Sequence, residues 1–107
     1  GLVGYPPVEH MLAVLIVSRV QEDGERLGKE MTDLVKRKMT DVAGLRVIGP
    51  AQASVGKVAD LYRHSFYIRH GAYQILVEAK DRLENFCRER ELKGQTVQFD
   101  FDPMNTF

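Results

Sequence analysis

Apolar and polar residues follow two different periods along this chain, and the periods divide it into strands and helices. The unbroken apolar run from Met11 to Val17 predicts a strand that is central in a sheet or covered on both sides. A short strand is expected from Leu45 to Ile48, ended by Gly49-Pro50. Tyr62 to His70 and Val97 to Asp102 alternate with a period of two, which predicts two further strands.

Two segments have helical spacing instead. Apolar residues recur every three or four positions from Glu25 to Thr40 and again from Ala72 to Glu91, which predicts two amphipathic helices. The apolar stripes consist of Leu27, Met31, Leu34, Val35 and Met39 in the first, and Ile75, Leu76, Ala79, Leu83, Phe86 and Cys87 in the second. The polar stretch Gln21 to Gly24 is expected to separate strand from helix. Ala51 to Leu61 has no clear period and is expected to be a long loop.

The predicted order is therefore strand, helix, strand, strand, helix, strand. This order is typical of the ferredoxin-like β-α-β-β-α-β fold. We therefore expect an α+β protein, a two-layer α/β sandwich with a four-stranded antiparallel sheet and both helices on one face. A chain of 107 residues fits one domain, 1–107, with residues 1–9 as an entry segment.

Composition limits the possible functions. Fifteen basic and fifteen acidic side chains give a net charge of zero, so nucleic-acid binding would have to come from a local patch. The lone Cys87 excludes an internal disulfide and a cysteine-pair zinc site, and its helical spacing predicts a small buried hydrophobe. No apolar run is long enough to span a bilayer. We expect a cytoplasmic protein that does not contact a membrane.

The sequence shows no equipment for catalysis. It has no glycine-rich loop ending in Gly-Lys-Ser/Thr and no paired cysteines, so we expect no catalytic residue, cofactor or metal and no ATPase activity from this chain alone. A metal or acid–base cluster would be conceivable from His10, His64 and His70 with Asp100 and Asp102. The alternation places His64 on the apolar side of its strand and the aspartates on the polar side of theirs, which favours a packing histidine.

The stretch that follows Gly49 is the candidate binding site. A loop of about 12 residues is uncommon in a compact domain and is often functional. This one holds Lys57 and leads into Tyr62 and Arg63, and the next strand places Arg63, Tyr67 and Arg69 on one face. Cations beside an aromatic ring suit nucleic acid, because charge binds phosphates and a flat ring stacks on bases. The alternative is an ordinary solvated strand face.

Three segments carry a family resemblance: Tyr5-Pro6-Pro7, then Gly49 to Ala53 leading through Lys57 to Tyr62-Arg63, and finally Val97 to Asn105. In this order they resemble the C-terminal domain of bacterial primosomal protein N′, the replication-restart DNA helicase PriA. The resemblance implies an α/β sandwich similar to ribosomal protein S10. It also implies that Lys57, Tyr62 and Arg63 match the basic–aromatic–Arg pattern of the family.

The resemblance further implies a C-terminal DNA-binding and docking domain that recognises branched DNA at stalled forks and supports replisome reloading. The parent protein would be an ATP-dependent 3′-to-5′ DNA helicase with ATP, magnesium and zinc, none of which this stretch would hold. Its implied partners are branched or forked DNA, its own helicase lobes, the single-stranded DNA-binding protein and other primosome proteins. Family members from Proteobacteria tend to carry Arg and Gln near the positions of Tyr73 and Val77, in a region implicated in binding the acidic tail of the single-stranded DNA-binding protein. Tyr73 and Val77 do not supply those groups.

Two hypotheses from other classes stay open. Ferredoxin-like domains also serve as small-molecule-binding regulatory modules, which would require a glycine-rich ligand loop where Gln21 to Gly24 stands. A protein–protein adaptor is the second hypothesis, in which Lys57, Arg63 and Arg69 pair with acidic residues of a partner.

Overall fold

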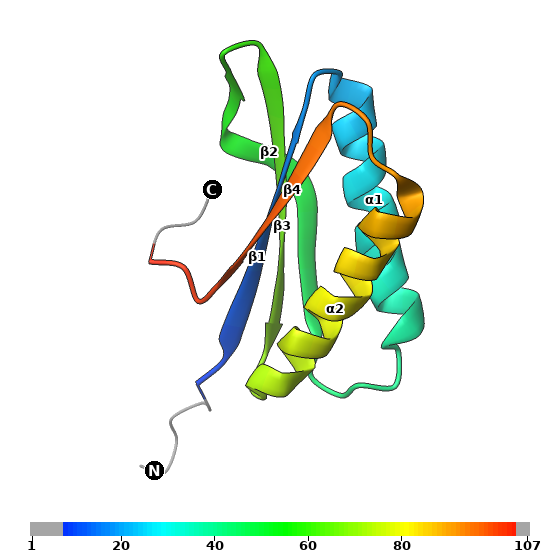
Figure 1. Ribbon diagram of the computed structural model, residues 1–107. Helices are drawn as coiled ribbons and strands as arrows, with labels where there is room; N and C mark the ends of the chain where they lie inside the picture. The colour runs from blue at the N-terminus through cyan, green and yellow to red at the C-terminus, as the bar shows by residue number, and fades with distance from the viewer. Residues whose placement is uncertain (1–7, 105–107) are drawn as a thin grey trace.

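The chain forms two layers, a sheet and a pair of helices (Figure 1). The structure is a computed structural model that describes residues 8–104, apart from the side chains of residues 54–58. The elements are β1 (His10–Ser18), α1 (Gln21–Lys38), β2 (Arg46–Val58), β3 (Leu61–His70), α2 (Tyr73–Arg90) and β4 (Gln95–Phe101). Tyr5-Pro6-Pro7 of the expected entry segment and Asn105 lie outside the described residues.

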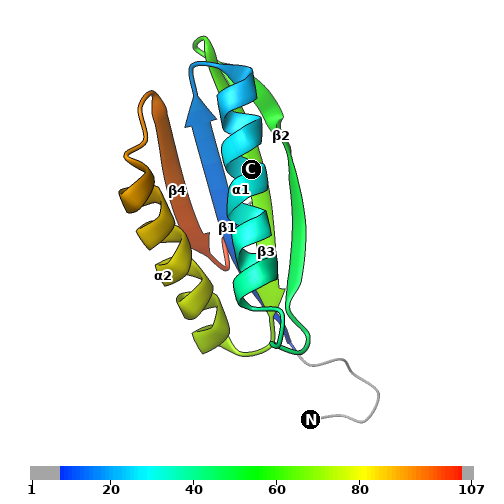
Figure 2. The ribbon, with the colours of Figure 1, turned by 90° about the vertical axis from the view of Figure 1, so that its right-hand side faces the viewer.

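The four strands lie in the order β2-β3-β1-β4, and each neighbouring pair is antiparallel. Both helices cover the same face of the sheet, as the two views show (Figures 1 and 2). The predicted ferredoxin-like β-α-β-β-α-β fold with a four-stranded antiparallel sheet is therefore confirmed. The apolar run of β1 is explained by its place between β3 and β4.

The core lies between the sheet and the helices. β1 and β3 present alternate residues to it because successive side chains of a strand point to opposite faces. The helices contribute the stripes that their spacing predicted, with Leu34, Ile75, Phe86 and Cys87 only partly buried at the edges. The fully buried members are Leu12, Val14, Ile16, Leu27, Met31, Val35, Met39, Phe66, Ile68, Leu76, Ala79 and Leu83.

The expectation of a long loop from Ala51 to Leu61 is wrong, as is the expected end of the strand at Gly49-Pro50. β2 continues to Val58 and joins β3 through a tight turn at Ala59 and Asp60. The register of β2 against β3 shifts between Ile48 and Ala51 and again between Gln52 and Lys57. Such shifts interrupt the alternation of faces, so this strand shows no period of two in the sequence.

The first helix also begins earlier than expected. Gln21 to Gly24, expected to be a break, forms the first turn of α1. Glu22 and Asp23 suit this place because acidic side chains stabilise the positive end of the helix dipole. Gly24 is buried against the sheet, so this turn has no apolar side chain to reveal it.

Candidate functional site

The face of the sheet opposite to the helices, here called the helix-free face, carries three of the predicted site residues. On β3, His64 is 3% exposed and Phe66 and Ile68 are fully buried on the helix side. The alternation of a strand therefore places Arg63, Tyr67 and Arg69 on the helix-free face, together with the small Ser65. The sequence predicted this division of β3 correctly.

The register identifies the neighbours of these residues. Tyr67 pairs with Ile48 of β2 on one side and with Ala13 of β1 on the other. Ile48 is 44% exposed, although isoleucine is one of the residues most often buried. Tyr67 thus lies near the middle of a partly apolar row that crosses the sheet. Cross-strand pairs also place Arg46 beside Arg69 and Val17 beside Arg63.

A charge cluster occupies the end of this face. The Glu9 carboxylate pairs with Arg46, and its Oε1 lies 3.8 Å from Nε of Arg69. A distance of 3.8 Å is too long for a hydrogen bond, and the buried Nε of Arg69 has no acceptor in the described part of the chain. Two guanidinium groups share one carboxylate, so the cluster keeps an excess of one positive charge. No local pattern in the sequence identifies Glu9 as part of this cluster.

The other two predicted site residues are placed differently. Tyr62 alternates to the helix side of β3, opposite to Arg63, as the period of two predicted. Lys57 lies in β2 rather than in a loop, and its backbone pairs with that of Tyr62. The side chain of Lys57 lies outside the described part of the structure. The five residues therefore divide between the two faces and the end of the β2–β3 hairpin.

The histidines are not gathered into one site. Nδ1 of His10 lies 2.8 Å from Oδ2 of Asp102, while His70 accepts a hydrogen bond from the Ala72 amide at Nδ1. Among residues 8–104, described as above, no group of three or more His, Cys, Asp or Glu side chains is placed to hold a metal ion. His64 is buried apart from the others, as the packing interpretation predicted.

Asp102 has a structural role that the sequence did not reveal. The His10 ring and then the Met11 amide, which donates to Oδ1 at 2.7 Å, hold the pKa of Asp102 below its usual value. The carboxylate thereby joins the end of β4 to the start of β1.

Cys87 is half-buried, and this burial, followed by the charge of Glu84, raises the pKa of its thiol.

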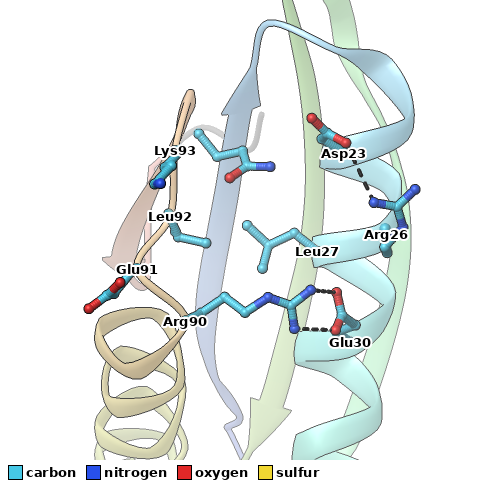
Figure 3. Close-up of a pocket in the computed structure, with 9 residues that line it drawn as sticks. Asp23, Arg26, Leu27, Glu30, Arg90, Glu91, Leu92 and Lys93 are labelled. Carbon is cyan, nitrogen blue, oxygen red and sulfur yellow. Dashed lines mark hydrogen bonds and ion pairs between the residues drawn. The ribbon is translucent and has the colours of Figure 1, made fainter.

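A polar pocket of about 220 Å³ lies between α1 and the connection from α2 to β4 (Figure 3). Nη2 of Arg90 binds Oε1 of Glu30 at 2.7 Å, and Nη1 binds the second oxygen, so the two helices are linked by a bidentate pair. This pair raises the pKa of Arg90. Asp23 and Arg26 pair at 3.5 Å on the same wall. The charges of this pocket largely compensate one another, which makes it a poor site for an anion.

Neither helix of the described residues is long and apolar enough to cross a membrane.

A search of curated proteins found no match to this sequence. A de novo designed protein, Foldit4, has a similar structure, with a TM-score of 0.65 and 17% sequence identity over 92% of this chain and 100% of the designed one. At that identity the likeness concerns the fold alone. The family described as the primosomal protein N C-terminal domain matches residues 1–104.

Proposed function

This chain belongs to the family of C-terminal domains of primosomal protein N, the PriA replication-restart helicase, and on that premise we propose that it binds branched DNA. In this proposal the domain helps to seat the DNA of stalled forks and packs against the helicase lobes of its parent protein. Replisome reloading would then depend on it indirectly, through the position of the DNA.

The observation that carries the proposal is the row of Arg63, Tyr67 and Arg69 on the helix-free face. Both helices lie on the other side of the sheet, so no helix covers this face (Figure 1). Four-stranded sheets of other nucleic-acid-binding domains use the same device, with aromatic side chains of the central strands stacking on bases. Tyr67 belongs to such a central strand.

The charge pattern favours weak and local binding. The chain has no net charge, so long-range attraction to DNA is absent. Contact then depends on Arg63 and on the excess positive charge of the Glu9 cluster, to which Arg69 belongs. We propose that this affinity supplements tighter DNA binding elsewhere in the parent helicase.

The domain is proposed to be an accessory part of an enzyme and to catalyse nothing itself. ATP, magnesium and zinc would then belong to the parent protein. The proposed partners besides DNA are the helicase lobes, the single-stranded DNA-binding protein and other primosome proteins, all in the cytoplasm.

Fluorescence anisotropy with a forked oligonucleotide, measured over a series of salt concentrations, tests the proposal. Arg63→Ala and Arg69→Ala should each flatten the slope of log affinity against log salt by about 0.7 to 0.9, because each removes about one phosphate contact. Tyr67→Ala should cost about 1 kcal/mol with little change of slope, because stacking carries no counterion release.

Arg88→Ala is the matched control, since it removes a cation from the exposed surface of α2. It should leave both slope and affinity as in the wild type. If Arg63→Ala and Arg69→Ala bind forks as the wild type does across the whole salt series, the row is a solvated strand face. The adaptor hypothesis would then account better for the exposed Ile48 and its neighbouring cations.

A further inference from the structure

β2 forms the edge of the sheet beside α1 (Figure 2). A second hollow lies between these two elements on the helix side of the sheet. It measures about 400 Å³ and is here called the His64 groove. Its walls include Lys29 and Lys36 of α1 together with Pro50 and Gln52 of β2, and His64 of β3 also lines it. A hollow of this size falls within the range of ligand sites, about 300 to 1,000 Å³.

His64 is the unusual member of this lining. The residue is 3% exposed, and neither Nδ1 nor Nε2 has a hydrogen-bond partner in the described part of the chain. A neutral imidazole offers one donor and one acceptor, and leaving both unmet in a buried place is costly. Gln52 pairs with His64 across the strands, so its amide emerges on the same face of the sheet. The groove therefore combines an imidazole, which can donate or accept according to its tautomer, with a side-chain amide that can do both.

Two glycines of α1 set the shape of this region. A Cβ atom at Gly24 would lie 2.7 Å from Nδ1 of His64, and one at Gly28 would lie 3.0 Å from Cβ of Pro50. The helix can approach the two strands this closely only because both positions lack a side chain. At Gly24, α1 therefore places no side chain against the His64 ring.

We propose that the His64 groove binds an unstacked nucleobase, with His64 and Gln52 hydrogen-bonded to its polar edge. The edge of a base carries donors and acceptors side by side, and one imidazole nitrogen, which donates or accepts according to its tautomer, matches this edge together with the side-chain amide of Gln52. Lys29 and Lys36 line the groove, but Glu25 and Asp33 balance their charge. Phosphate alone therefore finds no excess of positive charge there, and recognition depends on the base.

The inference rests on the proposed function and extends it from one face of the sheet to the other. Ala51 also lines the groove, yet it pairs with Ser65, whose side chain lies on the helix-free face. A single strand that crosses the helix-free face therefore reaches the groove by passing over the edge strand at Ala51 and Gln52. The same chemistry would accept the base of a free nucleotide.

Two probes distinguish a base of fork DNA from the base of a free nucleotide. The first is a titration of the 107-residue chain with each of the four deoxynucleoside monophosphates and, separately, with inorganic phosphate, followed by NMR of the His64 ring and the Gln52 amide. The second is a forked oligonucleotide with 2-aminopurine in its single-stranded arm, followed by fluorescence. Nucleotides should shift the His64 and Gln52 signals where phosphate does not.

His64→Leu and Gln52→Ala should each weaken nucleotide binding about threefold to tenfold, the usual effect of losing a neutral hydrogen bond. Gln74→Ala, at an exposed position of α2, is the matched control and should change nothing. His64→Leu removes a buried polar group without a partner, so it should fold at least as stably as the wild type. Gln52 is exposed, so its variant tests the groove even if His64→Leu fails to fold.

The inference is overturned if no monophosphate shifts these signals, or if phosphate alone shifts them equally. If forks bind through Arg63 and Arg69 while the NMR signal of the His64 ring does not shift, the proposed function is supported and the groove inference is wrong. Monophosphates that bind while forks do not would contradict the proposed function and assign the groove to free nucleotides. The decisive result is a change of 2-aminopurine fluorescence on fork binding that occurs in the wild type and in Gln74→Ala but not in His64→Leu. It would identify DNA as the source of the base.

Discussion

Of the two glycines of α1, Gly24 leaves less space for a side chain than Gly28 does. A glycine inside a helix normally costs about 1 kcal/mol relative to alanine, so Gly→Ala at an open position stabilises a protein. Here the added Cβ would lie 2.7 Å from both Nδ1 of His64 and Oγ of Ser18. Because such overpacking costs about 1 to 3 kcal/mol, we expect Gly24→Ala to lower the free energy of unfolding. Urea denaturation measures it, and a gain of stability would contradict the tight approach.

Asp102 makes the stability depend on pH. Its pKa is lowered in the folded chain by the hydrogen bonds from His10 and from the Met11 amide. The carboxylate therefore stabilises the fold fully above its unfolded pKa of about 3.9, and this contribution is lost as the pH falls through the lower, folded value. Asp102→Asn should be less stable than the wild type at pH 7, and the difference should shrink toward pH 2.

Asn suits that test because Asp102 has a φ of 44°, a left-handed conformation that Asn tolerates. The effect should be small, since the pair is exposed and solvent screens it. Urea unfolding at several pH values measures it. Asp100→Asn, two residues earlier on β4, is the control, and an equal pH dependence in both variants would argue against the His10–Asp102 pair as the cause.

The candidate site was only partly predictable at this scale. Alternation alone placed Arg63, Tyr67 and Arg69 on one face and His64 on the other, because β3 is regular. Glu9 precedes β1 and contacts its arginines only through the folded sheet, so no local pattern identifies it. The surroundings of the His64 ring depend in part on Gly24 of α1, which is far from it in sequence.

At the scale of elements, segments with strong periodicity were predicted correctly, and segments with irregular backbone were not. The two helices and the strands β1, β3 and β4 lie close to where their spacing placed them. The predicted strand was shorter than β2 because β2 contains turn-like residues, among them Gly49 with a φ of 98°. Its register shifts also remove the period of two that would indicate a continuous strand. The start of α1 was missed because the helix dipole and a buried glycine, rather than an apolar stripe, define its first turn.

The β2–β3 turn offers a test of this hairpin. Ala59 and Asp60 have φ values of 52° and 64°, which is the left-handed geometry of a two-residue hairpin turn. Alanine is poorly suited to that conformation, whereas asparagine adopts it readily. Ala59→Asn should therefore stabilise the fold by about 0.5 to 1 kcal/mol, as judged from the urea midpoint. Ala43→Asn, in the loop between α1 and β2, is the control, and an equal gain there would contradict the turn geometry.

At the scale of the whole molecule, where the charges lie matters more than their sum. Fifteen positive and fifteen negative side chains cancel, yet the fold distributes them unevenly over the surface. Lys80 and Glu84 pair at 3.0 Å on α2, and Arg90 binds Glu30 between the helices, so the helix layer is largely self-neutralised. The helix-free face keeps an excess of one positive charge where Arg46 and Arg69 share Glu9.

Glu9 therefore restrains DNA binding in the proposed function, and removing its charge should strengthen that binding. Glu9→Gln releases Arg46 and Arg69 for phosphates, so forks should bind more tightly at low salt. The slope of log affinity against log salt should become steeper by about 0.7 to 0.9, the value for one additional phosphate contact. Glu84→Gln makes the same change of net charge on α2 and is the matched control. Fork anisotropy over a salt series measures both variants. Equal gains of affinity in the two would mean that net charge alone attracts the DNA. A gain confined to Glu9→Gln would locate the contact on the helix-free face.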